Sequence, residues 1–324
     1  MRNPAIPRST DTPRIMLVNA RAGARSAAVV RPVAAALGIP RHAILEIGRN
    51  GTARELAARA VRDRVPVVVT VGGDGTIHQV IQEIAGTTTA LGIVPSGTSN
   101  DLARDLGVPQ DLDAVLTTLS QGHRTSVDLL RMGRTRIATA GGLALPAMIA
   151  RRCNELRAGR HRLWAVRLGP AIYSLVAAHQ ICRGTLPVAD YVVRAGQGTP
   201  RRHRGSAVLF SRIPTFGGGL QLVPKGTLSP GAFAALVITA CTRRALLDTL
   251  LRLRRGKRLG RNAVVYNNLR RLDLRSDALV GAFGDGEWLR LRYRTRITVE
   301  PAALQVLAPD SPRTVLPATL EEAV

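Results

Sequence analysis

Apolar residues occur in short runs along the first 130 positions, and longer helix-like stretches separate these runs. Residues 67–71 read Val-Val-Val-Thr-Val, and residues 90–94 are a second continuous apolar run. Continuous β-branched runs are typical of parallel strands that are buried on both faces. Residues 15–18 and 43–47 are two further candidate strands. Strands that alternate with helices predict a parallel sheet with crossover helices.

Helices are predicted between these strands, at 26–37, 52–64, 77–84 and 102–106. Thr52 precedes Glu55 by three residues, which is the spacing of a capping box. Positions 77, 80, 81 and 84 are apolar and form one helical stripe. His78 lies off this stripe, so we expect it at a solvated helix position, with a place in a binding cleft as the alternative.

Beyond about residue 125 the pattern changes to short alternating runs separated by glycine and proline, which predicts a second, mainly antiparallel β domain. Helix-like patches interrupt it at 145–156, 165–181 and 242–254. A chain of 324 residues exceeds the usual size of one domain. We therefore expect a disordered lead-in, an α/β domain, a β-rich domain and a loose tail, at residues 1–13, 14–130, 131–294 and 311–324.

Two glycine-rich turns carry the first candidate chemistry. Residues 72–76 read Gly-Gly-Asp-Gly-Thr, residues 95–101 read Pro-Ser-Gly-Thr-Ser-Asn-Asp, and each turn lies between a predicted strand and a helix-like stretch. Glycine lets backbone N–H groups approach phosphate oxygens, and a helix N-terminus adds favourable potential. One such turn is commonly structural, whereas two at strand ends predict a nucleotide triphosphate site. Asp74 and Asp101 place a carboxylate in each turn, which indicates a cation, usually Mg²⁺.

The net charge is +24, with 46 basic residues against 22 acidic ones. Part of this bias is attributable to genomic base composition, but the resulting field attracts anionic partners. Aromatic residues are only 3% of the chain, which argues against single-stranded nucleic acid, where stacking supplies much of the binding. An anionic membrane surface is therefore the favoured partner, and no specific nucleic acid is expected.

Cysteine usage and the apolar runs bear on the compartment. Cys153, Cys182 and Cys241 form no metal-ligand pair and no redox motif, which favours reduced cysteines in a cytoplasmic protein. The longest apolar stretch, residues 137–150, is shorter than the roughly 20 residues that a membrane span requires. We expect no transmembrane helix, and the lead-in lacks the apolar region of a secretory signal.

Several motifs, taken in order, resemble one protein family from Ile15 to about Pro309. They are the two glycine turns, Val127-Asp128-Leu129, Gly217-Gly218-Gly219 with Val223-Pro224, Asp285-Gly286-Glu287, and residues 301–307. The chain resembles bacterial diacylglycerol kinases and related soluble lipid kinases, which share a catalytic domain with sphingosine and ceramide kinases. The resemblance implies an NAD kinase-like α/β domain facing a β-sandwich domain across a cleft, with strands at about 295–310 returning to the first domain.

The resemblance also implies an activity, namely ATP-dependent phosphorylation of a lipid hydroxyl, with diacylglycerol giving phosphatidic acid as the leading reaction. A sphingoid base or another lipid, an NAD kinase-like reaction, and a non-enzymatic basic protein that binds nucleotide or membrane remain alternatives. Carried onto this sequence, the ATP phosphates lie against Gly72, Gly73, Gly75 and Thr76, with Asn19, Gly97, Thr98 and Asn100 completing the pocket. Asp74 and Asp101 help to organise Mg²⁺.

Phosphoryl transfer needs positioning, charge neutralisation and a group that accepts the proton of the attacking hydroxyl. Asp285 is the predicted base, Glu287 is the second candidate, and Asp74 is the alternative because related sphingosine kinases are thought to use their turn aspartate. Without the resemblance, Asp285-Gly286 would read as an ordinary hairpin turn.

Two departures from the family pattern stand out. Asn19-Ala20-Arg21-Ala22-Gly23 replaces Asn-Pro-x-Ser-Gly and loses a serine hydroxyl, for which Arg21 or Arg25 is a candidate substitute. Residues 228–231 read Leu-Ser-Pro-Gly where some members carry an acidic stretch linked to a structural Mg²⁺, so we doubt that second metal site here.

Residues 242–261 interleave leucines with basic residues, a pattern suited to anionic headgroups. The alternative, slightly favoured, is a helix whose leucines pack on the β domain. A second basic cluster at 201–204 is expected in a loop. We expect a cytoplasmic protein that associates peripherally with the inner face of the cell membrane, and we leave a homodimer open.

Overall fold

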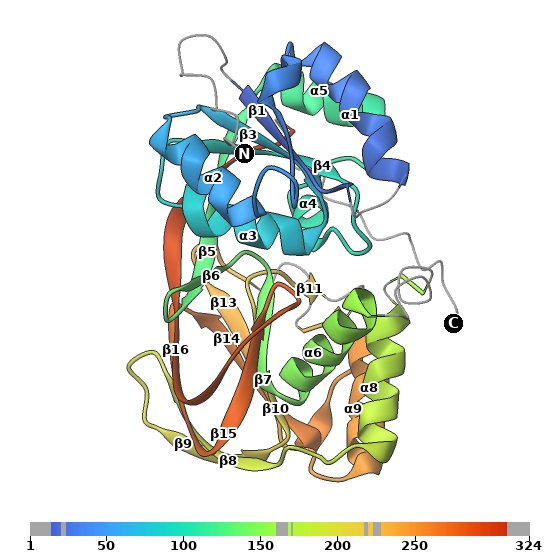
Figure 1. Ribbon diagram of the computed structural model, residues 1–324. Coiled ribbons are helices and arrows are strands. Elements are labelled where there is room, and N and C mark those ends of the chain that lie inside the picture. Colours follow the sequence, from blue (N-terminus) through green and yellow to red (C-terminus); the bar gives the residue numbers. More distant parts are fainter. Residues whose placement is uncertain are drawn as a thin grey trace, which may run out of the picture.

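The computed structural model describes residues 14–20, 24–159, 168–169, 171–216, 220–222 and 228–309. It consists of an α/β domain and a β-rich domain stacked end to end (Figure 1). The predicted motif residues Arg21, Gly217 to Gly219 and Val223-Pro224 lie outside the described residues, as does the side chain of Arg25.

The first domain is the predicted parallel sheet with crossover helices. Its strands pair in parallel in the order β4-β3-β1-β2, and every residue of β3 is buried, as its β-branched run indicates. Its elements are β1 Arg14–Val18, α1 Ala24–Ala36, β2 Ile44–Glu46, α2 Ala53–Arg62, β3 Val67–Gly72, α3 Asp74–Ile84, β4 Ala90–Pro95, α4 Asp101–Asp105 and α5 Leu112–Gln121. The capping box at Thr52 and Glu55 is formed, which confirms that prediction.

The second domain is a mainly antiparallel sheet that carries helices on one face. Its strands run in the order β14-β13-β10-β7-β15-β16, with β8 paired to both β15 and β9. The strands are β5 Arg124–Met132, β6 Thr135–Ile137, β7 Ala140–Ala144, β8 Ala189–Ala195, β9 Arg201–Gly205, β10 Ala207–Ser211, β11 Thr215–Phe216, β12 Leu220–Gln221, β13 Phe233–Ile238, β14 Ala263–Leu269, β15 Arg271–Gly284 and β16 Glu287–Leu307. The helices are α6 Leu145–Ala158, α8 Ala171–Arg183 and α9 Arg243–Arg254.

Strand β16 joins the two domains. It pairs with β15 in the second domain and then lies parallel to β4, with Gln305 opposite Ala90 and Val306 opposite Leu91. Figure 1 shows this long strand running along one side of the molecule from the lower domain to the upper one. The predicted return of the C-terminal strands to the first domain is therefore confirmed.

Two local predictions need correction. The basic cluster at 201–204 is not a loop but belongs to β9, where His203 pairs with Tyr191 of β8. The predicted helix at 165–181 corresponds to α8, which begins at Ala171; residues 160–167 lie outside the described part of the chain.

Helix α9 mostly covers the β domain. Leu246 and Leu253 are buried in a cluster with sheet residues, and Leu247 and Leu250 pack against it, whereas Leu251 is exposed. The packing alternative is thus the better description of this basic helix. None of the helices in the described residues has the length and apolar character that a membrane span requires.

Candidate active site at the domain junction

The two glycine turns lie in contact with each other at the ends of β3 and β4. Ser96 N donates to Gly72 O at 3.0 Å, which holds the turns side by side. A Cβ on Gly73 would lie 2.8 Å from Gly97 Cα, and a Cβ on Gly97 would collide with Gly73 Cα. Neither position can carry a side chain, because backbone would have to move. The sequence predicted this pair of turns, and the structure brings them together.

Asn100 closes the second turn on itself. Its backbone is in the left-handed region, with φ of 48°, and its side chain is buried. Oδ1 accepts from Gly97 N and Nδ2 donates to Gly97 O, both at 3.0 Å. The Asn100 amide thus shapes the turn, while Thr98 is exposed at its tip.

Asn19 links β1 to the first turn of α3. Its backbone N–H donates to Val71 O at 3.0 Å, and its Nδ2 donates to Thr76 Oγ1 at 2.8 Å. Three strand ends of the parallel sheet, β1, β3 and β4, therefore converge on one edge, as expected for the carboxyl ends of adjacent parallel strands.

Asp74 and Asp101 face each other across the two turns. Asp101 N donates to Asp74 Oδ1 at 2.8 Å, and Asp101 Oδ1 accepts from Arg104 at 3.0 Å. Burial, followed by the negative charges of Asp101 and Asp285, raises the pKa of Asp74 to about 7. In the described residues no group of three or more histidine, cysteine or acidic side chains is arranged to hold a metal by itself.

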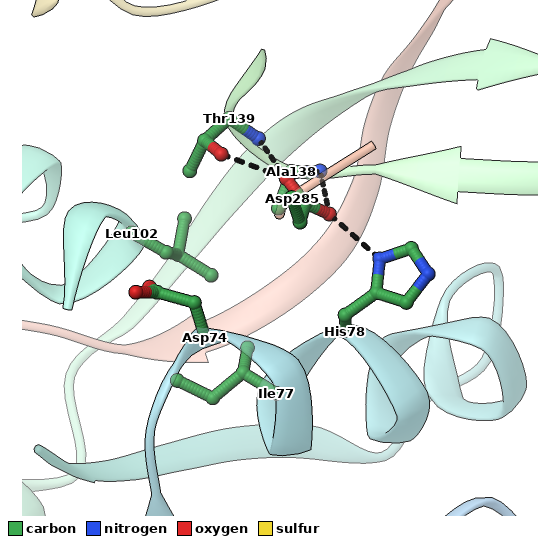
Figure 2. Close-up of a pocket in the computed structure, with 7 residues that line it drawn as sticks. All are labelled: Asp74, Ile77, His78, Leu102, Ala138, Thr139 and Asp285. Atoms are coloured by element: carbon green, nitrogen blue, oxygen red, sulfur yellow. Dashed lines mark hydrogen bonds and ion pairs between the residues drawn. The ribbon is translucent and has the colours of Figure 1, made fainter. Parts of the chain in front are cut away.

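Asp285 reaches this site from the second domain. It occupies the two-residue turn between β15 and β16, where Gly284 pairs with Glu287. Asp285 and Gly286 both have positive φ, 49° and 82°, as a type I′ hairpin requires. The hairpin that the dipeptide predicts is therefore present, and it points its carboxylate into a small pocket. The pocket is lined by Asp74, Ile77, His78, Leu102, Ala138, Thr139 and Asp285 (Figure 2).

The Asp285 carboxylate is buried and accepts hydrogen bonds on both oxygens. Oδ1 accepts from Thr139 N at 2.8 Å and from Thr139 Oγ1 at 2.7 Å. Oδ2 accepts from Ala138 N at 2.9 Å and lies 2.9 Å from His78 Nδ1. Burial opposes the charge, but the hydrogen bond and charge of His78 and the bonds from Ala138 and Thr139 hold the pKa of Asp285 below its ordinary value.

His78 is buried at the domain junction, so the expectation of a solvated position was wrong; it lines the small pocket instead. Burial alone would lower its pKa, but the hydrogen bond and charge of Asp285, with the charge of Glu287, raise it. His78 and Asp285 thus form a buried hydrogen-bonded pair, and each side chain shifts the pKa of the other toward its charged form. A signal for this was available, because His78 lies four residues after Asp74 and so shares its face of α3.

Glu287 crosses the junction as well. A Cβ on Gly75 would lie 2.6 Å from Glu287 Oε1, so the carboxylate rests directly against the glycine turn. Asn154 of α6 supports it, with Nδ2 3.3 Å from Glu287 Oε2 and 3.2 Å from Gly286 O. Asn154 and Thr139 were not predicted as site residues, because nothing in the sequence around either of them marks it as functional.

A tyrosine and an arginine complete the second-domain side. Arg157 Nη1 donates to Tyr173 Oη at 3.0 Å, and its guanidinium lies 4.9 Å from the ring centre. Tyr173 Oη lies 3.2 Å from the position of a Cβ on Gly286. Burial raises the pKa of Tyr173, so its hydroxyl is a neutral donor beside the hairpin turn.

The fold and this site define a two-domain kinase with NAD kinase-like architecture. The family model for the diacylglycerol kinase catalytic domain matches residues 13–132, and the model for the YegS C-terminal NAD kinase beta sandwich-like domain matches residues 147–308. The chain belongs to the diacylglycerol kinase family, and it is a lipid kinase.

Known relatives agree with this assignment. The chain is 27% identical over 271 residues to a diacylglycerol kinase of Mycobacterium tuberculosis (strain ATCC 25618 / H37Rv), covering 79% of this chain and 81% of the relative. It is 26% identical over 243 residues to a diacylglycerol kinase of Staphylococcus aureus (strain Newman), covering 74% and 73%.

Two solved structures share the fold. A diacylglycerol kinase from Bacillus anthracis str. Sterne superposes with a TM-score of 0.66 at 17% identity, over 92% of this chain and 97% of that one. An NAD kinase from Archaeoglobus fulgidus, solved in complex with ATP, superposes with a TM-score of 0.55 at 12% identity, over 92% and 94%. The predicted NAD kinase-like fold is confirmed.

Proposed function

We propose that this protein transfers the γ-phosphate of Mg-ATP to the hydroxyl of diacylglycerol, which gives phosphatidic acid. The observation that carries the proposal is the meeting of the paired glycine turns with the Asp285 carboxylate at one domain junction. The names of the curated relatives support diacylglycerol as the acceptor, and a sphingoid base or another lipid alcohol remains the alternative.

The contact between Gly73 and Gly97 supports ATP as the donor. A Cβ at either glycine would meet the backbone of the other turn, so both turns keep a bare backbone, which phosphate groups can approach. Gly72, Gly75 and Thr76 extend this surface along α3, and Asn19 fixes Thr76. Gly97 and Thr98 form its second edge, which Asn100 holds in shape.

The carboxylates of Asp74 and Asp101 fit a Mg²⁺ ion that phosphate oxygens would also bind. Burial, followed by the negative charges of Asp101 and Asp285, raises the pKa of Asp74, and a bound cation would favour its ionised form. When bound, Mg²⁺ neutralises phosphate charge as the phosphoryl group moves. The fit depends on the nucleotide, because Asp74 and Asp101 alone are too few ligands for a protein-only site.

Asp285 is the proposed proton acceptor. Its ionised carboxylate takes the proton of the lipid hydroxyl while the hydroxyl oxygen bonds to the γ-phosphorus and the bond to the ADP oxygen breaks. The bonds from Ala138, Thr139 and His78 orient this carboxylate, and the incoming hydroxyl would replace one of these donors. Glu287, which rests against Gly75, is the second candidate, and Asp74 is the alternative base.

The setting follows from charge and substrate. The strongly basic chain is attracted to anionic headgroups, which supports a cytoplasmic protein that visits the inner membrane surface to reach its lipid. A homodimer stays a prediction that the oligomeric state in solution would test.

The test uses ATP labelled in its γ-phosphate and mixed micelles that contain diacylglycerol or a sphingoid base. We expect labelled phosphatidic acid from the wild type. Asp285→Asn should lower the rate by a factor of about 100 or more, since general base catalysis contributes at least that. Asp273→Asn is the matched control, because Asp273 lies on the same strand but pairs with surface arginines.

The remaining outcomes separate the alternatives. If the sphingoid base is labelled in preference, the acceptor is wrong but the kinase class stands. If Asp74→Asn abolishes transfer while Asp285→Asn retains it, the base is Asp74. A wild type that labels no lipid at all, with Mg-ATP bound, would overturn the proposal.

A further inference from the structure

Four large apolar side chains are exposed on the hairpin of β15 and β16, beside the candidate active site. They are Trp288, Leu279, Leu291 and Tyr293, whose relative exposures are 37%, 45%, 52% and 55%. The chain has only two tryptophans and four tyrosines, so the presence of one of each on this hairpin is notable. Clustered exposed apolar side chains mark binding surfaces more often than single ones do.

The pairing register, which shifts between Gly281 and Phe283, places Trp288 and Leu291 on one face of the sheet. Phe283 pairs with Trp288, and Gly281 pairs with Leu291. A Cβ on Gly281 would lie 3.3 Å from Ala147 of α6 and 3.5 Å from Trp288 Nε1. This is therefore the face that α6 covers further along the sheet. Alternation adds Tyr293 to the face of Leu291.

Leu279 belongs to the same face. Its neighbour Val280 is buried in the hydrophobic cluster that includes Leu272 and Leu274. Side chains alternate along a strand, so Leu279 and Gly281, on either side of Val280, point away from that cluster. The helix-covered apolar face thus continues past α6 and is left bare at the hairpin. We call Leu279, Trp288, Leu291 and Tyr293 the hairpin face.

Arginines lie beside the hairpin face. Arg290 and Arg294 lie on the same strand and are exposed. The guanidinium of Arg151 lies 5.7 Å from the Trp288 ring centre, where it also pairs with Glu155 at 3.0 Å. Asp277, the nearby acid on β15, accepts from Asp190 N at 2.9 Å.

These observations indicate what the hairpin face binds. Tryptophan and tyrosine favour the boundary between water and lipid, because each combines an apolar ring with a polar group. Arginines beside them are attracted to anionic headgroups. A second copy of this chain would instead bring like charges together, and each copy carries +24. We propose that the hairpin face docks this protein on an anionic membrane surface, an inference that rests on the proposed lipid kinase function.

Docking here would place the site at the lipid. Trp288 directly follows Glu287, which lies against Gly75, so the hairpin face ends where the candidate active site begins. The competing surface is made by Leu175 of α8 and Leu251 of α9, which are 54% and 51% exposed. Those two lie on helices joined by the Arg254 to Ser174 bond of 2.9 Å.

The test compares two double variants in sedimentation with phosphatidylglycerol-rich vesicles. Leu291→Glu with Tyr293→Glu changes the hairpin face, and Leu175→Glu with Leu251→Glu is the matched control. The hairpin variant should bind vesicles at least roughly tenfold more weakly, since it removes two membrane-buried side chains. Its activity on short-chain diacylglycerol in detergent micelles should match the wild type, which also shows that it is folded.

Each other result decides against the proposal. Wild-type vesicle binding by the hairpin variant, or loss of binding in the control variant instead, would overturn it. Loss of a dimer in gel filtration of the hairpin variant would assign this face to contact between copies. A wild type that is active on micelles but never binds vesicles would refute the docking proposal and leave the lipid kinase function standing. Vesicle binding without any lipid kinase activity would refute the proposed function.

Discussion

His78 Nδ1 lies 2.9 Å from Asp285 Oδ2, and this pair joins the α/β domain to the β-rich domain. The two residues are separated by 207 positions, and their side chains are only 8% and 4% exposed. Arg212 makes a second link, with Nη2 2.7 Å from Asp105 Oδ2 and Nε 2.9 Å from Ala138 O. The carboxylate of the proposed base is thus part of the joint between the domains.

We predict that the thermal stability of the protein falls as the pH rises above 6.5, the ordinary pKa of histidine. The pKa of His78 is raised when folded, so its contribution is fully present below that value and is lost as the pH passes the raised pKa. Asp285 and Glu287 favour the charged ring, and Arg54 opposes it. The pKa of Asp285 is lowered, so its contribution to stability is present at neutral pH and is lost only as the pH falls into the acid range.

The variant His78→Phe tests this pair. It should cost about 3–5 kcal/mol, the usual cost of removing one partner from a buried ion pair, and its melting temperature should depend less on pH above 6.5. His179→Phe is the control, since His179 is exposed on α8. Equal pH dependence in His78→Phe and the wild type would show that another group titrates.

Asp74→Asn should stabilise the metal-free protein while it reduces activity. Burial and neighbouring carboxylates raise the pKa of Asp74 from 3.8 to about 7, so ionising it weakens the folded state progressively over that range and fully above it. The gain at pH 8 is on the order of 4 kcal/mol, because the pKa rises by about three units and each unit corresponds to about 1.4 kcal/mol. Asparagine keeps the oxygen that accepts from Asp101 N.

Scanning calorimetry in chelator checks this prediction. The gain should vanish well below pH 3.8, where the wild-type carboxyl is protonated in both the folded and the unfolded state. With Mg-ATP added, the wild type should gain more stability than Asp74→Asn. An Asp74→Asn protein less stable than the wild type at pH 8 without metal would contradict the electrostatic account.

Local sequence patterns were sufficient for the parallel sheet and for its two glycine turns, whereas the facing β-sandwich and the returning C-terminal strands were implied by the family resemblance. The run at 67–71 predicts a buried parallel strand because β-branched residues and hydrophobic continuity are local properties, and β3 confirms it. The glycine turns follow from the same logic, since a strand end, a glycine and a helix start are adjacent in sequence. The two-residue hairpin at Asp285-Gly286 is likewise encoded by its dipeptide.

Contacts between the domains were not predictable in this way. His78 lies off the apolar stripe that packs α3 on its own sheet, so the stripe alone predicts that the His78 side chain is exposed to solvent. Its burial depends on a surface more than 200 residues away. The prediction of a loop at residues 201–204 was wrong for a related reason. Their basic composition favours a loop, but these residues pair with β8.

Gly75→Ala should impair ATP binding through Glu287. A Cβ at Gly75 would lie 2.6 Å from Glu287 Oε1, so the carboxylate must move or the domains must separate. In the Glu287→Ala background the same change should cost much less, because the colliding atom is gone. Calorimetric ATP binding by the four proteins of this double-mutant cycle gives the coupling directly. Additive effects would show that Glu287 yields without strain.

Asp128→Asn should destabilise the place where β16 enters the first domain. Asp128 Oδ2 accepts from Gly231 N at 3.0 Å, and Oδ1 accepts from Ala302 N at 2.8 Å. Both partners have positive φ, 72° and 49°, so each bond supports a turn that the backbone does not favour by itself. The NH2 group of asparagine cannot accept, so one N–H loses its partner, at a cost of about 1 kcal/mol.

Denaturant unfolding of the wild type, Asp128→Asn and Asp128→Ala measures the change in the free energy of unfolding. The unfolding free energy of Asp128→Asn should lie between that of the wild type and that of Asp128→Ala, which removes both acceptors. Asp113→Asn, at an exposed position on α5, is the control and should change the unfolding free energy little. If Asp128→Ala is no less stable than Asp128→Asn, the second bond contributes nothing, and the Val127-Asp128-Leu129 motif must be explained by something other than the support of Ala302 and Gly231.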